Sequence, residues 1–236
     1  MPSTELSPGL VVKDTPLEQK LSDYKLIAFD MDSTLITIEC IDEIADVAGK
    51  KAEVAAITEA TMRGEITDFK ESLRQRVRKL AGVTQVQMQR VLAERLQLSP
   101  GAQMLVQAAQ AAGLKVLLVS GGFTFFAEHV RSLLNIDFVR ANVLEIHSGV
   151  LTGGLVEQSW GDICDGAEKR RTLLEVASLL GIAPGQCIAV GDGSNDIAMM
   201  QVAGLSVAYH AKPRVRAEAN VCINTGGLDR LLEIVR

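Results

Sequence analysis

A short apolar run that ends in two carboxylates constrains this chain more than any other feature. Residues 24–29 are Tyr-Lys-Leu-Ile-Ala-Phe, and Asp30 and Asp32 follow directly. Such a run is typical of a strand buried on both faces of a parallel sheet. Open α/β sheets bind ligands at the carboxyl ends of their strands, so both acids are expected at an active-site edge. Because two neighbouring acids repel each other, they predict a cation such as Mg²⁺ between them; a solvated acidic turn is the alternative.

The composition is that of an ordinary globular protein. The 236 residues are 47% hydrophobic and 22% charged, which allows one large or two modest domains. A net charge of -5 supplies no basic stripe, so we expect neither a nucleic-acid nor a membrane partner. No signal peptide is evident, and no apolar run approaches the roughly 18 residues of a membrane span. The four cysteines form no C-x-x-C pair, which predicts buried thiols in a cytoplasmic protein.

Helical periodicity follows the acidic turn. Ile41 and Ile44 lie on one face of a predicted helix. Three more segments rich in helix-forming residues come next, at 51–63, 68–81 and 84–96. They predict a helical-bundle cap over residues 37–98, inserted after the first strand. Residues 1–23, which contain three prolines, are expected to form a loosely ordered lead-in.

Strands and helices alternate in the rest of the chain. The pattern predicts strands at 115–120, 138–142, 187–191, 205–209 and 221–223, and helices at 102–112, 125–134 and 167–180. Glycines among apolar residues in 143–160 predict a β-hairpin flap. The alternation predicts an α/β fold with a Rossmann-like, doubly wound parallel sheet, formed by residues 24–36 and 99–236.

Two more predicted strands end in polar turns. Ser120-Gly121-Gly122 follows the strand at 115–120, and Gly-Asp-Gly-Ser-Asn-Asp at 191–196 closes the strand at 187–191. Either turn alone is ordinary turn chemistry or an anion-binding nest. Three parallel strands that all end in this way meet at one edge of the sheet, so their coincidence favours a functional site.

Phosphoryl transfer through an aspartyl-phosphate fits these residue types. A carboxylate can act as nucleophile, a hydroxyl and backbone N–H groups can bind phosphoryl oxygens, and no Ser or Cys is paired with a His base. The charge balance also requires a lysine, for which Lys169 at the start of the helix 167–180 is the candidate. Arg170 and Arg171 point at other helical angles, although a slip of one turn would make one of them the phosphate ligand.

The motifs resemble a known family. Asp30-x-Asp32-x-Thr34, Ser120-Gly121, Lys169 and the turn 191–196 resemble, in order and spacing, the four motifs of the haloacid dehalogenase superfamily. Four segments further resemble its phosphoserine phosphatase family, at 30–35, 39–45, 120–124 and 209–213. The likeness covers nearly everything from residue 24 to the end of the chain.

The resemblance implies a role for each acid. Asp30 would be the nucleophile that takes the phosphoryl group, and Asp32 would protonate the leaving oxygen and then activate water. Mg²⁺ would be bound by the Asp30 carboxylate, the Asp32 backbone carbonyl and Asp192, with Asp196 supporting these ligands from behind.

The resemblance also implies which residues bind the substrate. The set comprises Ser120, Gly121 and Lys169 for phosphate, Asn195 for substrate or phosphate, and Glu39, Met62, Phe69 and Arg76 from the cap. Glu39 would bind the ammonium group of the substrate and Arg76 its carboxylate. Phe69, Leu73 and Arg76 are spaced to share one helix face, as such a wall requires.

The implied activity is Mg²⁺-dependent hydrolysis of O-phospho-L-serine in serine biosynthesis, by a monomer or homodimer. One alternative is transfer of the phosphoryl group to another small alcohol such as homoserine. Another is a receiver-like signalling domain that stores phosphate on Asp30. A storage domain needs no helical lid, so the predicted cap favours an enzyme, and multiple turnover of phosphate release would separate the two classes.

Overall fold

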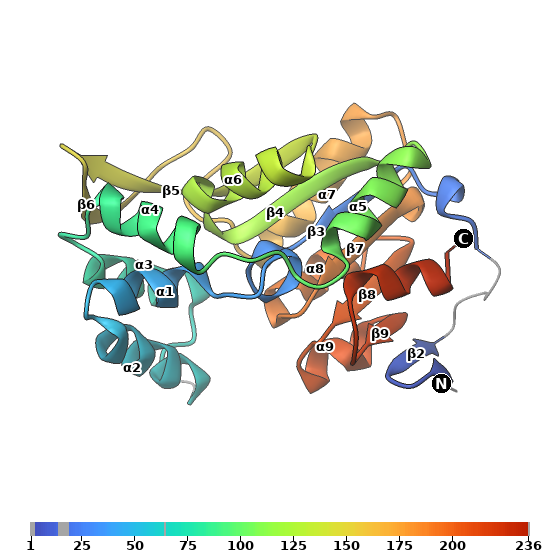
Figure 1. Cartoon of the computed structure of the whole chain (residues 1–236), viewed down its shortest axis with the longest axis horizontal. Coiled ribbons are helices and arrows are strands. Elements are labelled where there is room, and N and C mark those ends of the chain that lie inside the picture. Colours follow the sequence, from blue (N-terminus) through green and yellow to red (C-terminus); the bar gives the residue numbers. More distant parts are fainter. Residues whose placement is uncertain (1–2, 14–18, 64, 236) are drawn as a thin grey trace.

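The computed structural model describes residues 3–13, 19–63 and 65–235 (Figure 1). The strands of this part form one sheet in the order β1-β2-β9-β8-β7-β3-β4-β5-β6. Their bounds are β1 Ser3–Ser7, β2 Leu10–Lys13, β3 Leu26–Phe29, β4 Lys115–Phe123, β5 Phe138–His147, β6 Val150–Val156, β7 Cys187–Gly191, β8 Leu205–Tyr209 and β9 Val221–Ile223. The α-helices are α1 Cys40–Val47, α2 Lys51–Met62, α3 Phe69–Lys79, α4 Gln85–Glu94, α5 Ala102–Ala111, α6 Thr124–Leu134, α7 Gly166–Leu179, α8 Ile197–Met200 and α9 Pro213–Glu218.

Parallel pairing dominates the centre of the sheet. β3 pairs in parallel with β4 on one side and with β7 on the other. β5, β8 and β9 extend the parallel set outward. The chain therefore reverses its strand order at β3, which is where doubly wound sheets open a crevice at their carboxyl ends. The predicted α/β fold with a parallel sheet is confirmed.

Alternate residues of the central strands pack into two separate cores. Ile27 and Phe29 of β3 join the cluster that includes α5 and α6. Leu26 and Ala28 join the cluster that includes α7 and α8. Successive side chains of a strand point to opposite faces, so the continuous apolar run at β3 is explained by burial on both sides.

The loosely ordered lead-in predicted for residues 1–23 is wrong for much of its described part. β1 and β2 form an antiparallel hairpin, and β2 pairs with β9 near the other end of the sequence. Leu10 and Val12 alternate inward and are buried. The prolines misled the prediction because Pro8 lies in the turn between the two strands and not inside either of them. Residues 1–2 and 14–18 lie outside the described part.

The helices α1–α4 gather at one end of the molecule, beside the hairpin of β5 and β6 (Figure 1). The two segments that link them to the sheet run side by side. The Thr37 amide donates to the Gln97 carbonyl at 3.0 Å, and the Ser99 amide donates to the Leu35 carbonyl at 2.9 Å. The division of the chain into a cap at 37–98 and a core stays a prediction.

The hairpin of β5 and β6 forms hydrogen bonds with this helical insertion. β5 continues past the predicted end at residue 142 as far as His147, and β6 returns antiparallel to it. The turn between α3 and α4 bonds to β6, with the Gly82 amide donating to the Leu151 carbonyl at 2.9 Å and the Leu151 amide to the Val83 carbonyl at 2.8 Å. The insertion is thus attached to the sheet at two separate places.

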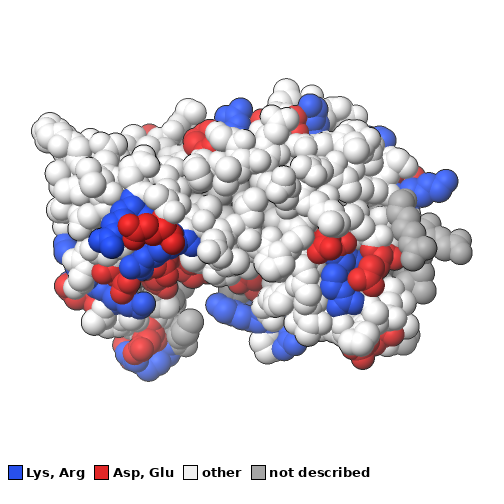
Figure 2. All heavy atoms as spheres, in the orientation of Figure 1, with Lys and Arg blue, Asp and Glu red and all other residues white. Residues whose placement is uncertain are grey.

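Charged side chains on the face drawn in Figure 2 concentrate over the helical insertion, where both signs are interleaved. Arg95, for example, forms ion pairs with Glu43 and Asp46. No helix of the described residues is long and apolar enough to cross a membrane.

The amino-terminal hairpin predicts a difference between two leucine truncations. Leu10→Ala removes a side chain that is fully buried and should lower the free energy of unfolding by about 2–5 kcal/mol. Leu6→Ala, in the exposed strand β1, should cost less than about 1 kcal/mol. Urea unfolding of both variants measures the difference, and equal small losses would show that the hairpin does not contribute to the folded core.

Candidate active site

Asp30 lies directly after β3, at the point where the strand order reverses. The residue is only 6% exposed, and its Oδ1 accepts a hydrogen bond from the Met31 amide at 2.7 Å. The turn Met31–Leu35 then carries the chain out of the sheet, with Ser33 in the left-handed region at φ 56°. A non-glycine residue seldom adopts this conformation, and here it lies one residue from Asp32.

Lys169 is fully buried and pairs with two carboxylates. Its Nζ lies 2.7 Å from Asp30 Oδ1 and 2.7 Å from Asp196 Oδ1. Although burial opposes it, the charges of Asp196 and Asp30 raise the pKa of Lys169, so the ammonium stays charged. Asp165 begins α7 by accepting a hydrogen bond from the Glu168 amide at 2.8 Å. Gly166 permits close packing, since a Cβ there would lie 2.9 Å from the Asn195 carbonyl oxygen.

A cluster of carboxylates forms a candidate metal site. Ligand oxygens of Asp30, Asp192 and Asp196 lie within 4.8 Å of one another. Burial, followed by repulsion from Asp196, raises the pKa of Asp192 to about 6, and the same two causes raise the pKa of Asp30. One lysine does not balance three acids, so the excess negative charge favours a bound cation.

The carboxylates of this cluster differ in how many of their oxygens already accept hydrogen bonds within the protein. Asp196 uses both oxygens within the protein, on Lys169 and on the Gly193 amide at 3.0 Å. Asp192 accepts one hydrogen bond from the Thr34 hydroxyl at 3.2 Å. No described residue donates to the Oδ2 atoms of Asp30 and Asp192, which leaves these two oxygens available for a ligand.

Asp32 has the properties of an acid that exchanges protons near neutral pH. Burial, and then the charge of Glu39, raise the pKa of Asp32 to about 7, although hydrogen bonds with Cys40 lower it. Its Oδ1 is buried and has no hydrogen-bond partner among the described residues. A carboxyl group with a pKa close to the working pH is suited to general acid–base catalysis.

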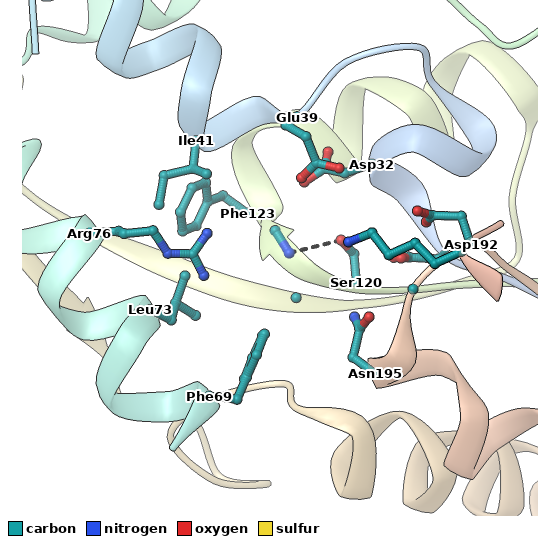
Figure 3. Close-up of a pocket in the computed structure, with 15 residues that line it drawn as sticks. Asp32, Glu39, Ile41, Phe69, Leu73, Arg76, Ser120, Phe123, Asp192 and Asn195 are labelled. Carbon is teal, nitrogen blue, oxygen red and sulfur yellow. Dashed lines mark hydrogen bonds between the residues drawn. The ribbon is translucent and has the colours of Figure 1, made fainter. Parts of the chain in front are cut away.

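The turn after the regular part of β4 places a hydroxyl beside these acids. Ser120 is 1% exposed, and its Oγ accepts a hydrogen bond from the Gly122 amide at 2.8 Å, the dashed line in Figure 3. A Cβ on Gly122 would lie 2.8 Å from Asp32 Oδ2, so the turn packs closely against Asp32 only because this residue is glycine.

A cavity of about 150 Å³ connects the acids with the helical insertion. Its far wall is formed by Ile41 of α1 and by Phe69, Leu73 and Arg76 of α3 (Figure 3). The Arg76 guanidinium points into the cavity and forms no ion pair with a described residue; its one hydrogen bond goes to the Ser72 carbonyl at 3.4 Å. Burial lowers the pKa of Arg76, an effect that the charges of Asp42 and Glu39 partly offset.

The structure brings most of the predicted site residues to this one cavity. It is lined by Asp30, Asp32, Glu39, Phe69, Arg76, Ser120, Gly121, Asp192 and Asn195. Lys169 and Asp196 lie buried behind Asp30. Arg170 and Arg171, the alternatives to Lys169, are exposed. Met62 ends α2, but its side chain lies outside what the structure describes.

Sequence reasoning missed several residues that line the cavity. Ile41 was assigned only to a helix face, and Phe123 and Lys212 received no role. Lys212 follows β8 by three residues, so the rule of strand ends applied to a fourth strand would have found it. Phe123 carried no such signal, because its inward direction depends on how β4 pairs with β5.

Comparison with known proteins gives a consistent assignment. A protein-family model described as "haloacid dehalogenase-like hydrolase" matches residues 24–204. A phosphoserine phosphatase from Polaromonas sp. is 67% identical over 236 residues, the full length of both chains. A phosphoserine phosphatase from Idiomarina loihiensis is 48% identical over 88% of this chain and 91% of its own.

Solved structures agree with this assignment. A phospho-aspartyl intermediate analogue of phosphoserine phosphatase superimposes with a TM-score of 0.82 at 35% identity, covering 93% of this chain and 100% of that one. A substrate-bound phosphoserine phosphatase complex gives a TM-score of 0.82 at 35% identity, over 90% of this chain and 99% of that one. The chain therefore belongs to the haloacid dehalogenase-like hydrolase family, in its phosphoserine phosphatase branch.

Proposed function

We propose that this chain is a Mg²⁺-dependent phosphatase that hydrolyses O-phospho-L-serine to L-serine and phosphate through an aspartyl-phosphate on Asp30. The observation that carries the proposal is the arrangement across one cavity. A set of groups suited to phosphoryl transfer lies on the sheet side, and the guanidinium of Arg76, which forms no ion pair with any residue that the structure describes, faces it from α3. A substrate with a phosphate at one end and a carboxylate at the other matches both walls.

Asp30 is the nucleophile in the first step. The Met31 amide and Lys169 hold its Oδ1, so its Oδ2 is free to attack phosphorus. The bond between phosphorus and the serine oxygen breaks, and Asp32 gives its proton to that oxygen. Serine leaves, and the phosphoryl group remains on Asp30.

Asp32 acts as a base in the second step. Now ionised, it takes a proton from a water molecule, whose oxygen attacks phosphorus and releases phosphate and the Asp30 carboxylate. The pKa of about 7 makes both protonation states of Asp32 accessible at neutral pH, as these two roles require.

The phosphoryl oxygens would be bound by Ser120, the Gly121 amide and Lys169, with Asn195 at the cavity wall. The Ser120 hydroxyl accepts from Gly122, and no described residue accepts its proton, so that proton can be donated to the substrate. Lys169 contributes a fixed positive charge that is already in place before the reaction, which is the most effective form of electrostatic catalysis.

The residues of the acidic cluster fit Mg²⁺. Carboxylate and carbonyl oxygens are the ligands that this ion prefers, and the Asp30 carboxylate, the free oxygen of Asp192 and the Asp32 carbonyl would bind it, while Asp30 Oδ2 faces the phosphorus. When bound, Mg²⁺ would offset the repulsion between the Asp30 carboxylate and the incoming phosphate. Asp196 would hold Lys169 and the Gly193 turn in place behind these ligands.

The helical insertion would select the substrate. Glu39 would bind the ammonium group and Arg76 the carboxylate, with Phe69 and Met62 beside the carbon chain. Ser33 donates a hydrogen bond to Glu39 Oε1 at 2.6 Å and so fixes the carboxylate whose charge helps to raise the pKa of Asp32.

We place the enzyme in the cytoplasm, as a monomer or homodimer. Its four cysteines are all buried as free thiols, which suits a reducing compartment.

Asp30→Asn should reduce phosphate release from phosphoserine by at least roughly 10³-fold, because an amide is a poor nucleophile and a weaker metal ligand. The substitution is isosteric, so circular dichroism should show an unchanged fold. A variant within tenfold of the parent rate would exclude the aspartyl-phosphate mechanism.

Arg76→Ala should lower kcat/KM for phosphoserine by roughly 10- to 150-fold, because it removes a charge-assisted hydrogen bond that is shielded from water. It should change kcat/KM little for p-nitrophenyl phosphate, which has no carboxylate. Ser120→Ala should damage both esters, because it acts on the phosphoryl group that they share. Ser120 is a better comparison than Lys169, whose removal would leave Asp30 and Asp196 unpaired in a buried position.

The matched control for Arg76 is Arg78→Ala, which removes the same charge from the same helix. Arg78 is exposed, pairs with Glu71 and does not line the cavity. It should leave both substrates unaffected. Equal losses on both esters for Arg76→Ala would mean that the arginine does not recognise the carboxylate.

The acidic cluster predicts that stabilisation by Mg²⁺ grows with pH. The pKa values of about 7 for Asp32 and about 6 for Asp192 lie above the ordinary value of 3.8. The folded chain therefore binds more protons than the unfolded chain between about pH 4 and pH 7, so without metal these groups contribute stability at low pH that is lost as the pH rises.

Protons and Mg²⁺ compete for the same oxygens. The increase in Tm on adding Mg²⁺ should thus be larger at about pH 8 than at about pH 5.5. Asp192→Asn should lose most of that increase, whereas Asp137→Asn, outside the cavity, should keep it. An increase that is the same at both pH values would contradict a metal site built from these carboxylates.

A further inference from the structure

β4 is interrupted where it passes the cavity. Its register with β5 runs through Val119 opposite Arg140 and resumes with Phe123 opposite Asn142. Ser120, Gly121 and Gly122 thus stand opposite a single residue of β5, and the regular ladder cannot hold all three. Such a bulge re-aims side chains near active sites, but it needs other partners for its backbone groups.

Asn142 of β5 supplies a hydrogen-bond partner for one of these backbone groups, the Gly121 carbonyl. Its side chain is buried, in a residue that is 1% exposed, and both of its polar atoms are used. Nδ2 donates to the Gly121 carbonyl at 2.8 Å, and Oδ1 accepts from the Cys164 amide at 2.8 Å. A carbonyl can only accept and an amide N–H can only donate, so these two partners also fix the orientation of the Asn142 amide.

The hydrogen bond to the Gly121 carbonyl has a consequence one bond further along the chain. The Gly121 carbonyl and the Gly122 amide belong to the same planar peptide unit, in which they point in opposite directions. Asn142 holds one side of this plane, and the other side donates to Ser120 Oγ at 2.8 Å. Because that oxygen already accepts a hydrogen bond from Gly122, its own proton must point elsewhere.

We infer that Asn142 is a positioning residue, which acts through the Gly121–Gly122 peptide to direct the Ser120 hydroxyl at the phosphoryl group. The inference rests on the proposed function, because it assigns Asn142 to the binding of the same phosphoryl oxygens. Asn142 does not line the cavity, so it acts without touching the substrate.

The hydrogen bond from the Cys164 amide to Asn142 Oδ1 supports this role. Cys164 directly precedes Asp165, the residue that begins α7 and thereby places Lys169. One buried side chain thus bridges the turn that carries Ser120 and the segment that leads to Lys169. The Cys164 amide thus anchors the Asn142 side chain in the orientation that presents Nδ2 to the Gly121 carbonyl.

Two substitutions at Asn142 test the inference. Asn142→Ala removes both hydrogen bonds, and Asn142→Asp keeps an acceptor for Cys164 but offers no donor to Gly121. Each should lower kcat roughly 10- to 100-fold, less than or comparable to the loss of a direct oxyanion-binding donor. The loss should be the same for phosphoserine and p-nitrophenyl phosphate, since the phosphoryl group is common to both.

A double-mutant cycle with Ser120→Ala separates positioning from general damage. Once the hydroxyl is absent, there is nothing for Asn142 to direct, so Asn142→Ala should cost less than about threefold in the Ser120→Ala background. The same cycle with Asn142→Asp, which preserves side-chain volume, gives the answer if the alanine variant does not fold.

Asn220 provides the matched control. Its side chain also takes part in two hydrogen bonds, both accepted by Oδ1, from the Ser206 amide at 3.0 Å and the Ser206 hydroxyl at 2.8 Å, but it lies away from the cavity. Asn220→Ala should lower Tm without changing kcat in either background. This comparison shows what the loss of an asparagine with two side-chain hydrogen bonds costs when no catalytic group depends on it.

The outcomes are distinct. Losses from Asn142 and Ser120 substitutions that multiply, or an Asn142→Ala variant with parental kcat, would overturn the positioning role and leave the proposed function intact. A Ser120→Ala variant with parental kcat on both esters would instead remove Ser120 from the proposed function, and the inference would fall with it.

Discussion

The buried ion cluster of Lys169 with Asp30 and Asp196 is the interaction on which the site depends. Removing an ammonium group from water costs several kcal/mol, and only close, well-directed carboxylates repay it. The two distances of 2.7 Å meet that requirement. The cluster joins the end of β3, the first turns of α7 and the turn after β7, so it fixes three segments at once. With Asp192 added, acids outnumber the lysine, and the remaining negative charge makes this a place for a cation.

The location of the cluster follows from the strand order. β4 and β7 flank β3 (Figure 1), and residues that follow all three strands line the same cavity. Under the proposed function, the segments after these strands supply the groups that act on phosphate. The helical insertion begins shortly after Asp30, and residues of its α1 and α3 line the same cavity. Chemistry and recognition would then come from separate elements, and substitutions in α3 would alter recognition without altering the chemistry.

Local pattern was sufficient to predict the parts of this site that end a strand or begin a helix. The apolar run before Asp30, the Ser120 turn and the acids after β7 each lie where the sequence changes abruptly from apolar to polar. Pairings between distant segments could not be predicted in this way. The amino-terminal hairpin depends on an edge offered by β9, and Asn142 depends on the register of β4 against β5. In both cases the local sequence is ordinary, and only the tertiary partner gives the residue its role.

The segment that joins β3 to the helical insertion also connects recognition with proton transfer. Ser33 donates its amide to the Ile38 carbonyl at 3.2 Å and its hydroxyl to Glu39, so the turn that holds Asp32 is tied to the start of α1. Glu39 is also the second cause, after burial, of the raised pKa of Asp32. Under the proposed function, an ammonium group paired with Glu39 would offset that negative charge and lower the pKa of Asp32, which would favour release of its proton to the leaving oxygen. A phosphate ester without the ammonium group would leave the repulsion in place, so the proposed acid would be most ready to act with the matching substrate bound.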